Sequence, residues 1–231
     1  MEKIYKTFYT TFIFDNRWKF FANGLLMTII LTISSFILGS IIGAIFCRLR
    51  FSKNKVLIKL TNIINVFLVQ LPTLVLLMVF VYIIFSKTSL SVVVIVIFGL
   101  TLKTASYMSD IFYSAVVSTN SGEAEAARAL GMNKYQSFIY ITLPQAIQNS
   151  LPVYKNQFIS TLQETSIVGS LAVQELTKSS TIVTSRTLNA FFSLISISIL
   201  YILIGLIGTS IINLIGKTKH IGDKLWLELK I

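Results

Sequence analysis

The sequence predicts an all-α membrane protein with about five transmembrane helices. Charged residues make up 13% of its 231 residues, whereas a soluble domain usually has about 25%. Long stretches contain no Asp, Glu, Lys or Arg, and a helix needs roughly 20 mainly apolar residues to cross a bilayer. The apolar runs are continuous rather than alternating, which argues against a transmembrane β-barrel.

Four spans follow from the charge-free runs at 23–47, 60–86, 88–102 and 188–216. A fifth span, around 145–172, is less apolar because it contains Lys155 and Glu164. Pro72 lies inside the second run, and it predicts a kink there because proline has no N–H for the helical hydrogen bond.

Residues 1–22 are predicted to form an interfacial segment ahead of the first span. The segment mixes aromatic and basic residues, and Ile4, Phe8 and Phe12 repeat at helical spacing. Aromatic rings and long basic side chains both settle at the membrane interface. A frayed tail is the alternative. A cleavable signal peptide is not expected, because no short apolar core ending in small residues is present.

Lys and Arg predict the orientation of the chain. The link after the first span contains Arg48, Arg50, Lys53, Lys55 and Lys59. The same side holds the loop after the third span and a basic tail, 217–231, and it carries more Lys and Arg than the other side. The positive-inside rule places that side in the cytoplasm, so the N-terminus is predicted outside and the C-terminus inside. The net charge of +11 therefore reflects topology, and no nucleic-acid binding is expected.

The predicted cytoplasmic loop, 118–144, contains a water-soluble helix within an otherwise apolar chain. The helix reads EAEAARALGM at 123–132. Asn120 followed by Glu123 predicts a capping box at its start, and Gly131 predicts its end. Leu143-Pro144 predicts the point where the chain bends back toward the membrane. So short a helix is marginal in water, so it either packs on its own chain or docks into a cleft of another protein.

The spacing of this loop has the form EAA-x3-G-x9-I-x-LP. It closely resembles the EAA loop of permease subunits in bacterial ATP-binding-cassette (ABC) importers. The resemblance implies a type I, MetI-like permease fold, with residues 23–216 as the permease domain. It also implies that the loop forms a coupling helix bound by a cytoplasmic ATPase. The coupling residues are then Glu125, Ala126, Ala127, Gly131, Leu143 and Pro144.

The segment 143–176 looks like the branch of these permeases that serves polar amino acids such as histidine, glutamate, glutamine and arginine, and opines. It contains LPQA at 143–146, NQFI at 156–159 and ETS at 164–166, and the resemblance extends over roughly 22–216. The chain departs from the branch at three places. Val69-Gln70-Leu71 stands in place of Arg-Gly-Thr, Tyr113 in place of Arg, and Gln163 in place of Lys. An opine, a sulfur amino acid or a methionine-like solute therefore remain alternative substrates.

Polar residues inside the spans are candidates for the substrate path, because charges are costly in a membrane. Lys103, Tyr107 and Asp110 share one helix face. Carboxylates could meet the ammonium group of an amino acid, and amide or hydroxyl groups could meet its carboxylate. The predicted path residues are Gln70, Asp110, Glu164, Thr165 and Ser166. The structural alternative pairs Lys103 with Asp110, and Lys155 with Glu164, between helices or across a dimer seam.

The sequence thus predicts a multi-pass permease subunit of an ATP-driven importer in the bacterial cytoplasmic membrane. The resemblance implies three kinds of partner: two ATPase subunits, a second permease subunit in a homodimer or paralogous heterodimer, and an extracytoplasmic substrate-binding protein. ATP would be hydrolysed by the partner, so this chain is predicted to be no enzyme. A stand-alone secondary transporter and a membrane scaffold are the alternatives from other classes. The absence of a visible internal repeat argues against the first.

No cofactor or metal is predicted in this chain. Cys47 and His220 are the only residues of their kinds, and no metal-ligand spacing appears. The GKT at 216–218 matches the last three residues of a P-loop motif, but the complete motif is absent because residue 211 is Ile where the motif needs Gly.

Overall fold

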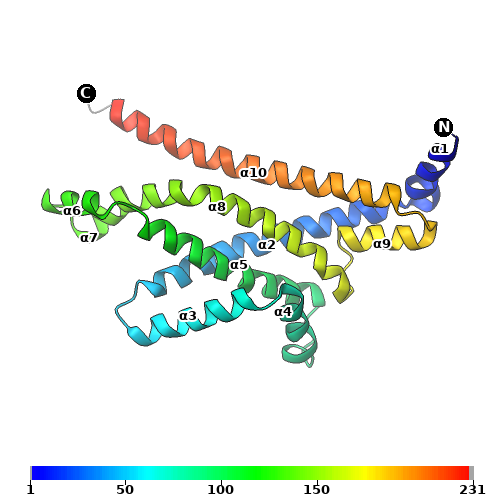
Figure 1. Cartoon of the computed structure of the whole chain (residues 1–231), viewed down its shortest axis with the longest axis horizontal. Helices are drawn as coiled ribbons and strands as arrows, with labels where there is room; N and C mark the ends of the chain where they lie inside the picture. Colours follow the sequence, from blue (N-terminus) through cyan, green and yellow to red (C-terminus); the bar gives the residue numbers. More distant parts are fainter. Residues whose placement is uncertain (1, 229–231) are drawn as a thin grey trace.

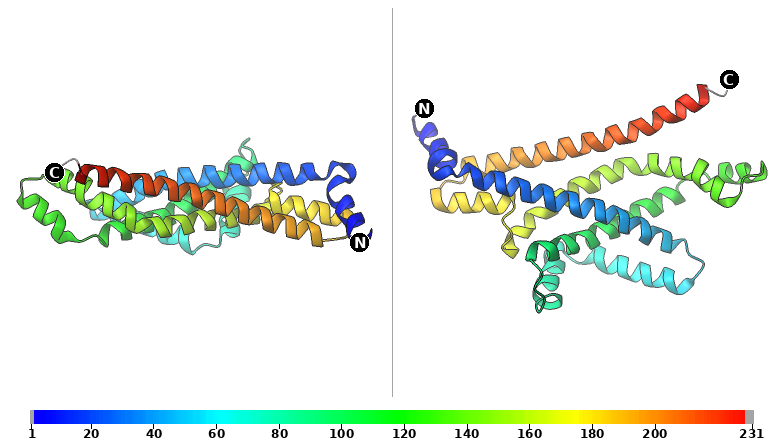
Figure 2. Two further views of the ribbon diagram at one scale, coloured as in Figure 1. Left: turned by 90° about the horizontal axis from the view of Figure 1, so that it is seen from above. Right: turned by 180° about the vertical axis from the view of Figure 1, so that it is seen from behind.

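The computed structural model describes the backbone of residues 2–228 and the side chains of residues 2 and 5–216. Within this range every regular element is a helix, which confirms the all-α prediction. The main helices run roughly along the long axis of the molecule (Figure 1). The view from above shows that they form a flat, elongated layer (Figure 2).

Among the described residues, three helices are long and apolar enough to cross a membrane. They are α2 (Trp18–Arg50), α5 (Val92–Val117) and α10 (Phe191–Glu228), the last by its first 26 residues. They correspond to the spans predicted at 23–47, 88–102 and 188–216, and α2 and α5 extend beyond the charge-free runs that predicted them. Residues 217–228 continue α10, so the predicted tail begins as helix rather than as a separate segment.

The second predicted span is broken rather than kinked. It consists of α3 (Lys55–Gln70), α4 (Thr73–Val79) and the π-helical turn η3 (Phe80–Ile84), and the two parts meet at 110°. Leu71 is extended, with ψ 132°, as expected for a residue before proline. α3 and α4 together make a fourth membrane span if both cross the membrane as one broken helix.

The remaining predicted span is α8 (Leu143–Glu164), followed by the 3-10 helix η5 (Thr165–Leu171) and by α9 (Leu176–Thr187). α8 has 22 residues and lies between α5 and α10 (Figure 1). Among the described helices, α8 is less apolar than α2, α5 and α10 and is not apolar enough to count as a span by composition alone. This agrees with the polar residues in its sequence.

The N-terminal segment packs on the spans. It forms α1 (Glu2–Phe8), the π-helical turn η1 (Tyr9–Ile13) and the 3-10 turn η2 (Phe14–Asn16), and its last residues already belong to α2. The ring of Phe8 lies 5.9 Å from that of Phe192, and Phe12 lies 5.4 Å from Phe21. These contacts are inconsistent with a frayed tail. The Ile4 side chain, part of the predicted repeat, lies outside the described residues.

The most extensive helix contact in the described chain joins α2 and α5. Gly39 and Gly43 of α2 face α5, and a Cβ atom at Gly43 would lie 2.5 Å from Met108 Cβ and 2.8 Å from the Ala105 carbonyl oxygen. Glycines four residues apart are a known device for bringing membrane helices together. The pairing supports an apolar core that also contains Leu31, Leu77, Val96, Leu100 and Val168.

Most connecting segments lie at two ends of the molecule, and the link between η3 and α5 lies at one side, beyond α4 (Figure 1). The link between α2 and α3, the loop after α5 and the end of α10 lie at one end, and α1 and α9 lie at the other (Figures 1 and 2). This is the grouping that the distribution of Lys and Arg predicts.

Candidate functional site

The predicted soluble helix is present as α6 (Ser121–Ala129). The Asn120 side chain caps it by accepting a hydrogen bond from the Gly122 N–H at 3.0 Å. The helix stops before Gly131, whose φ of +100° suits glycine and strains other residues. The capping box predicted with Glu123 does not form, because the Glu123 carboxylate accepts a hydrogen bond from Gln145 at 2.6 Å.

A short hairpin supports α6 from one side. α7 (Lys134–Ser137) follows Gly131 and has its own capping box, formed by Asn133 and Gln136. The Ser137 hydroxyl donates to the Ala124 carbonyl oxygen at 2.9 Å, and Ala127 is buried between the two helices. One side of α6 therefore packs on its own chain, as the first of the two alternatives predicted.

The other side of α6 and the hairpin around it remain exposed. Leu130 is 88% exposed, Tyr135 74% and Tyr140 68%. Glu125 and Ala126 are also exposed. An apolar surface of this kind at the tip of a loop is typical of a contact with another protein. The packing alternative therefore holds for one side of α6, and docking to another protein stays a prediction for the exposed side.

Leu143 and Pro144 lie at the base of this loop rather than at its tip. The chain reverses at 131–133, and the prediction that it bends at Leu143 is wrong, because Leu143 is helical with φ −64° and ψ −43°. A π-helical turn, η4 (Phe138–Thr142), leads into α8, and Pro144 occupies its first turn, where proline is tolerated. Leu143 lines a cavity of about 320 Å³ together with Cys47, Phe112 and Ala146.

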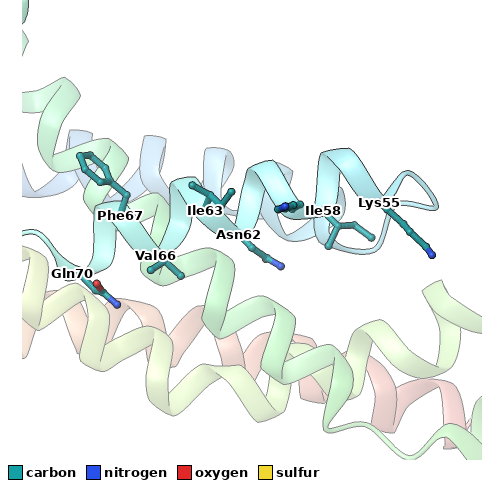
Figure 3. A pocket seen from close by; sticks show the side chains of 8 residues that line it. Lys55, Ile58, Asn62, Ile63, Val66, Phe67 and Gln70 are labelled. Atoms are coloured by element: carbon teal, nitrogen blue, oxygen red, sulfur yellow. The ribbon is translucent and has the colours of Figure 1, made fainter.

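Two of the predicted path residues lie beside the break between α3 and α4. Gln70, the last residue of α3, is exposed and lines a groove of about 660 Å³. The lining side chains of that groove follow α3 from Lys55 to Gln70 (Figure 3). Glu164, the last residue of α8, is half-buried, and its Oε1 accepts a hydrogen bond at 3.2 Å from Thr73 at the start of α4. Its Oε2 is buried without a partner among the described residues.

The next two predicted path residues bond their own backbone. The Thr165 hydroxyl donates to the Leu162 carbonyl oxygen at 2.7 Å, and the Ser166 hydroxyl to that of Gln163 at 2.7 Å. Thr165 is fully buried, whereas Ser166 is half-buried. Neither hydroxyl hydrogen is directed to a solute in this conformation.

Asp110 belongs to a separate cluster at the end of α2. Its Oδ1 accepts hydrogen bonds from Arg50 at 2.6 Å and from Asn65 at 2.9 Å. The Arg50 guanidinium also lies 4.1 Å from the centre of the Tyr113 ring, which in turn stacks on Phe51. The cluster therefore ties α2, α3 and α5 together.

Neither charge pair considered from the sequence forms within the described chain. Lys103 donates to backbone carbonyls of the α3–α4 break instead of to Asp110. Lys155 donates to the Asn213 side chain at 2.8 Å instead of to Glu164. The sequence placed Arg50 in a loop, so it gave no signal that this residue reaches back to a membrane helix.

The described residues contain no group of three or more His, Cys, Asp or Glu side chains that could hold a metal ion. Cys47 is buried and free. The GKT sequence lies inside helix α10, whereas a P-loop connects a strand to a helix.

Comparison with known proteins agrees with this arrangement. The family described as "Binding-protein-dependent transport system inner membrane component" matches residues 35–220. The probable amino-acid permease protein YxeN of Bacillus subtilis is 32% identical over 179 residues, which cover 76% of this chain and 80% of YxeN. The histidine/lysine/arginine/ornithine transport system permease HisM of Salmonella typhimurium is 28% identical, and 99% of this chain and 98% of HisM are covered.

Among solved structures, a chain of "an amino acid ABC transporter with histidines" superposes with a TM-score of 0.78. It is 26% identical in sequence, and the superposition covers 87% of this chain and 94% of that chain. The family match extends over more than half of the sequence. The chain therefore belongs to the inner membrane components of binding-protein-dependent transport systems.

Proposed function

We propose that this chain is the transmembrane permease subunit of an ATP-driven importer of polar amino acids. The named relatives are amino-acid permeases of this family, and they favour an amino acid over another small solute. The observation that carries the mechanism is the exposed surface of α6 around Leu130. α6 packs against its own chain on one side and exposes its other side to solvent. A helix that binds a second protein needs such an exposed side.

The partners of the chain follow from the family and the site. Importers of this family use ATP through a separate ATPase, so the chain itself supplies the path and the coupling. In the proposed complex two ATPase subunits bind the α6 helices of two permease subunits, which form a homodimer or a paralogous heterodimer. An extracytoplasmic binding protein delivers the amino acid to the opposite end.

The orientation and the domain boundaries are part of this proposal. The end with α6 and the end of α10 faces the cytoplasm, and the end with α1 and α9 faces outward. Residues 23–216 form the permease domain with the coupling loop 118–144, 1–22 the interfacial segment and 217–231 the cytoplasmic tail. Glu125, Ala126 and Gly131 belong to the ATPase contact itself, and Ala127, Leu143 and Pro144 support it from behind.

The substrate path is proposed to pass the α3–α4 break. Gln70 and Glu164 flank the break, and the groove along α3 offers polar groups on a membrane helix, which are Lys55, Lys59, Asn62 and Gln70. In this conformation Oδ1 of Asp110 and the hydroxyl hydrogens of Thr165 and Ser166 bond the protein, so we assign these three residues to the walls of the path rather than to solute binding.

The complex of the chain with its ATPase and binding protein tests this function. ATP hydrolysis would be measured in proteoliposomes with L-histidine, L-arginine, L-glutamine and L-glutamate in turn. We expect stimulation by at least one of them. If the complex forms but none of the four amino acids stimulates ATP hydrolysis, the proposed ATPase contact would stand and these four substrates would be excluded.

Glu164→Gln is expected to raise the apparent KM for uptake about tenfold or more. The reason is that a hydrogen bond to a charged group contributes about 1.5–3 kcal/mol, and 1.4 kcal/mol is a tenfold change. The Gln side chain keeps the size of Glu and can still accept from Thr73. Uptake kinetics of the responsive amino acid measure the change.

Asp110→Asn is the matched comparison, because the same chemical change is made in the cluster with Arg50. It is expected to lower the yield and thermal stability of the complex without a comparable rise in KM. A rise in KM for Asp110→Asn and none for Glu164→Gln would reverse the two assignments.

A further inference from the structure

The break between α3 and α4 leaves backbone carbonyl groups without their helical partners. The last helical bond of α3 runs from the Leu71 N–H to the Phe67 carbonyl oxygen at 3.2 Å. The Leu68 carbonyl would bond the N–H of residue 72, but that residue is proline. The chain then turns by 110°, so the Val69 carbonyl also loses its regular partner. Inside a membrane such groups must be satisfied by the protein itself.

Lys103 satisfies these carbonyl groups from the middle of α5. Its side-chain ammonium donates to the carbonyl oxygens of Leu68 at 2.9 Å and Val69 at 3.0 Å, and also to that of Leu71. An ammonium has three donors, so all of them are used. Lys103 is 3% exposed, and its charge lies at the C-terminal end of α3, where the helix dipole favours a cation.

The two sides of the break are held by different helices. Lys103 of α5 binds the α3 side, and Glu164 of α8 binds Thr73 on the α4 side. The interior of the bend is apolar, with Leu68, Leu76, Phe80 and Ile95 in one cluster. This cluster packs both α3 and α4 on α5. Loss of the hydrogen bonds from Lys103 or to Glu164 should therefore change the angle between the two helices without unfolding them.

We propose that Lys103 is a positioning residue of the transport path, and that its ammonium fixes the angle between α3 and α4 by replacing the N–H groups that the break removes. The inference rests on the proposed function in one respect, which is that Gln70 and Thr73 at the break border the path. Lys103 itself does not bind the solute, because its three donors already bind the protein.

A distance measurement tests the angle without reference to transport. Spin labels would be attached to cysteines at Val56 and Ile83, which are 72% and 69% exposed, in a Cys47→Ser background. The labelled chain, diluted with an excess of unlabelled chain, would be reconstituted with its ATPase in lipid nanodiscs. Lys103→Met is expected to shift or broaden the distance distribution between the labels. An unchanged distribution would overturn the proposal.

Two further variants sharpen this test. Lys103→Gln keeps two N–H donors without the charge, and it is expected to give an intermediate distribution. If Lys103→Met cannot be purified, this variant decides the question, because a distribution equal to that of the parent would contradict the proposal. Lys155→Met is the matched control, since the Lys155 ammonium binds a side chain of α10 and not the break. It is expected to leave the distance unchanged.

The functional consequence has a separate readout. In proteoliposomes with equal amounts of complex, Lys103→Met is expected to raise the apparent KM for uptake of L-histidine or L-arginine about tenfold, because misplaced groups bind the solute less well. A purely structural role would lower the maximal rate and leave KM unchanged, which would exclude positioning. If the parent complex transports neither these probes nor L-glutamine or L-glutamate, the proposed function loses its support, while the distance measurement still decides the role of Lys103.

Discussion

Replacing Gly131 by Asp is expected to reduce coupled uptake to background while the chain stays in the membrane. Gly131 has φ +100°, and a residue with a Cβ atom is strained there by about 1–2 kcal/mol. A Cβ atom would meet no other atom within 4 Å in the isolated chain. The chain therefore tolerates the added volume, and the effect arises from the altered end of α6 and from a new charge at the proposed ATPase contact.

The experiment compares uptake, membrane insertion and co-purification of the ATPase. Gly131→Ala serves as the control, because it introduces the same backbone strain without the charge. We expect Ala to reduce uptake partially and Asp to abolish it together with ATPase binding. Normal uptake by the Asp variant would refute the coupling role of this loop.

The second large effect is expected at the contact between α2 and α5. Gly43→Ala places a Cβ atom 2.5 Å from Met108 Cβ and 2.8 Å from a backbone oxygen, distances that force the helices apart. Overpacking of this kind costs about 1–3 kcal/mol. The thermal unfolding midpoint and the yield of the purified chain in detergent should therefore both fall.

Gly205→Ala is the matched control for this substitution. A Cβ atom at Gly205 would lie 3.9 Å from its nearest neighbour, Leu162, which is an ordinary contact. The change should be neutral or slightly stabilising, because Ala is a better helix former than Gly by about 1 kcal/mol. Equal stability of the two Ala variants would show that the α2–α5 distance adjusts freely.

Local signals predicted the coupling loop and the approximate positions of most spans. Asn120 and Gly131 act through neighbouring backbone groups, so their roles at the two ends of α6 can be predicted from the local sequence. Charge-free runs identify apolar helices for the same reason. The spacing of Gly39 and Gly43 is a further local signal, because glycines four residues apart favour close helix packing.

The polar contacts inside the membrane could not be predicted, because they join residues far apart in the sequence. Lys103 binds carbonyls more than 30 residues away, and Asp110 binds Arg50 at a separation of 60. Helical periodicity places Lys103 and Asp110 on one face, but it does not say which helix that face meets. The broken second span likewise depends on how α4 packs on α5, so Pro72 alone predicted a kink and not its size.

The unbroken course of the chain after Gly131 has a mechanical consequence. α7, the π-helical turn η4 and α8 follow one another without a loop from Lys134 to Glu164, which at 1.5 Å per residue is roughly 45 Å of helix. One end carries the support of α6, and the other end carries the carboxylate that binds α4. In the proposed complex, a displacement that an ATPase imposes on α6 would therefore reach the broken span through continuous helix, and Pro152 inside α8 is the point at which that helix could bend.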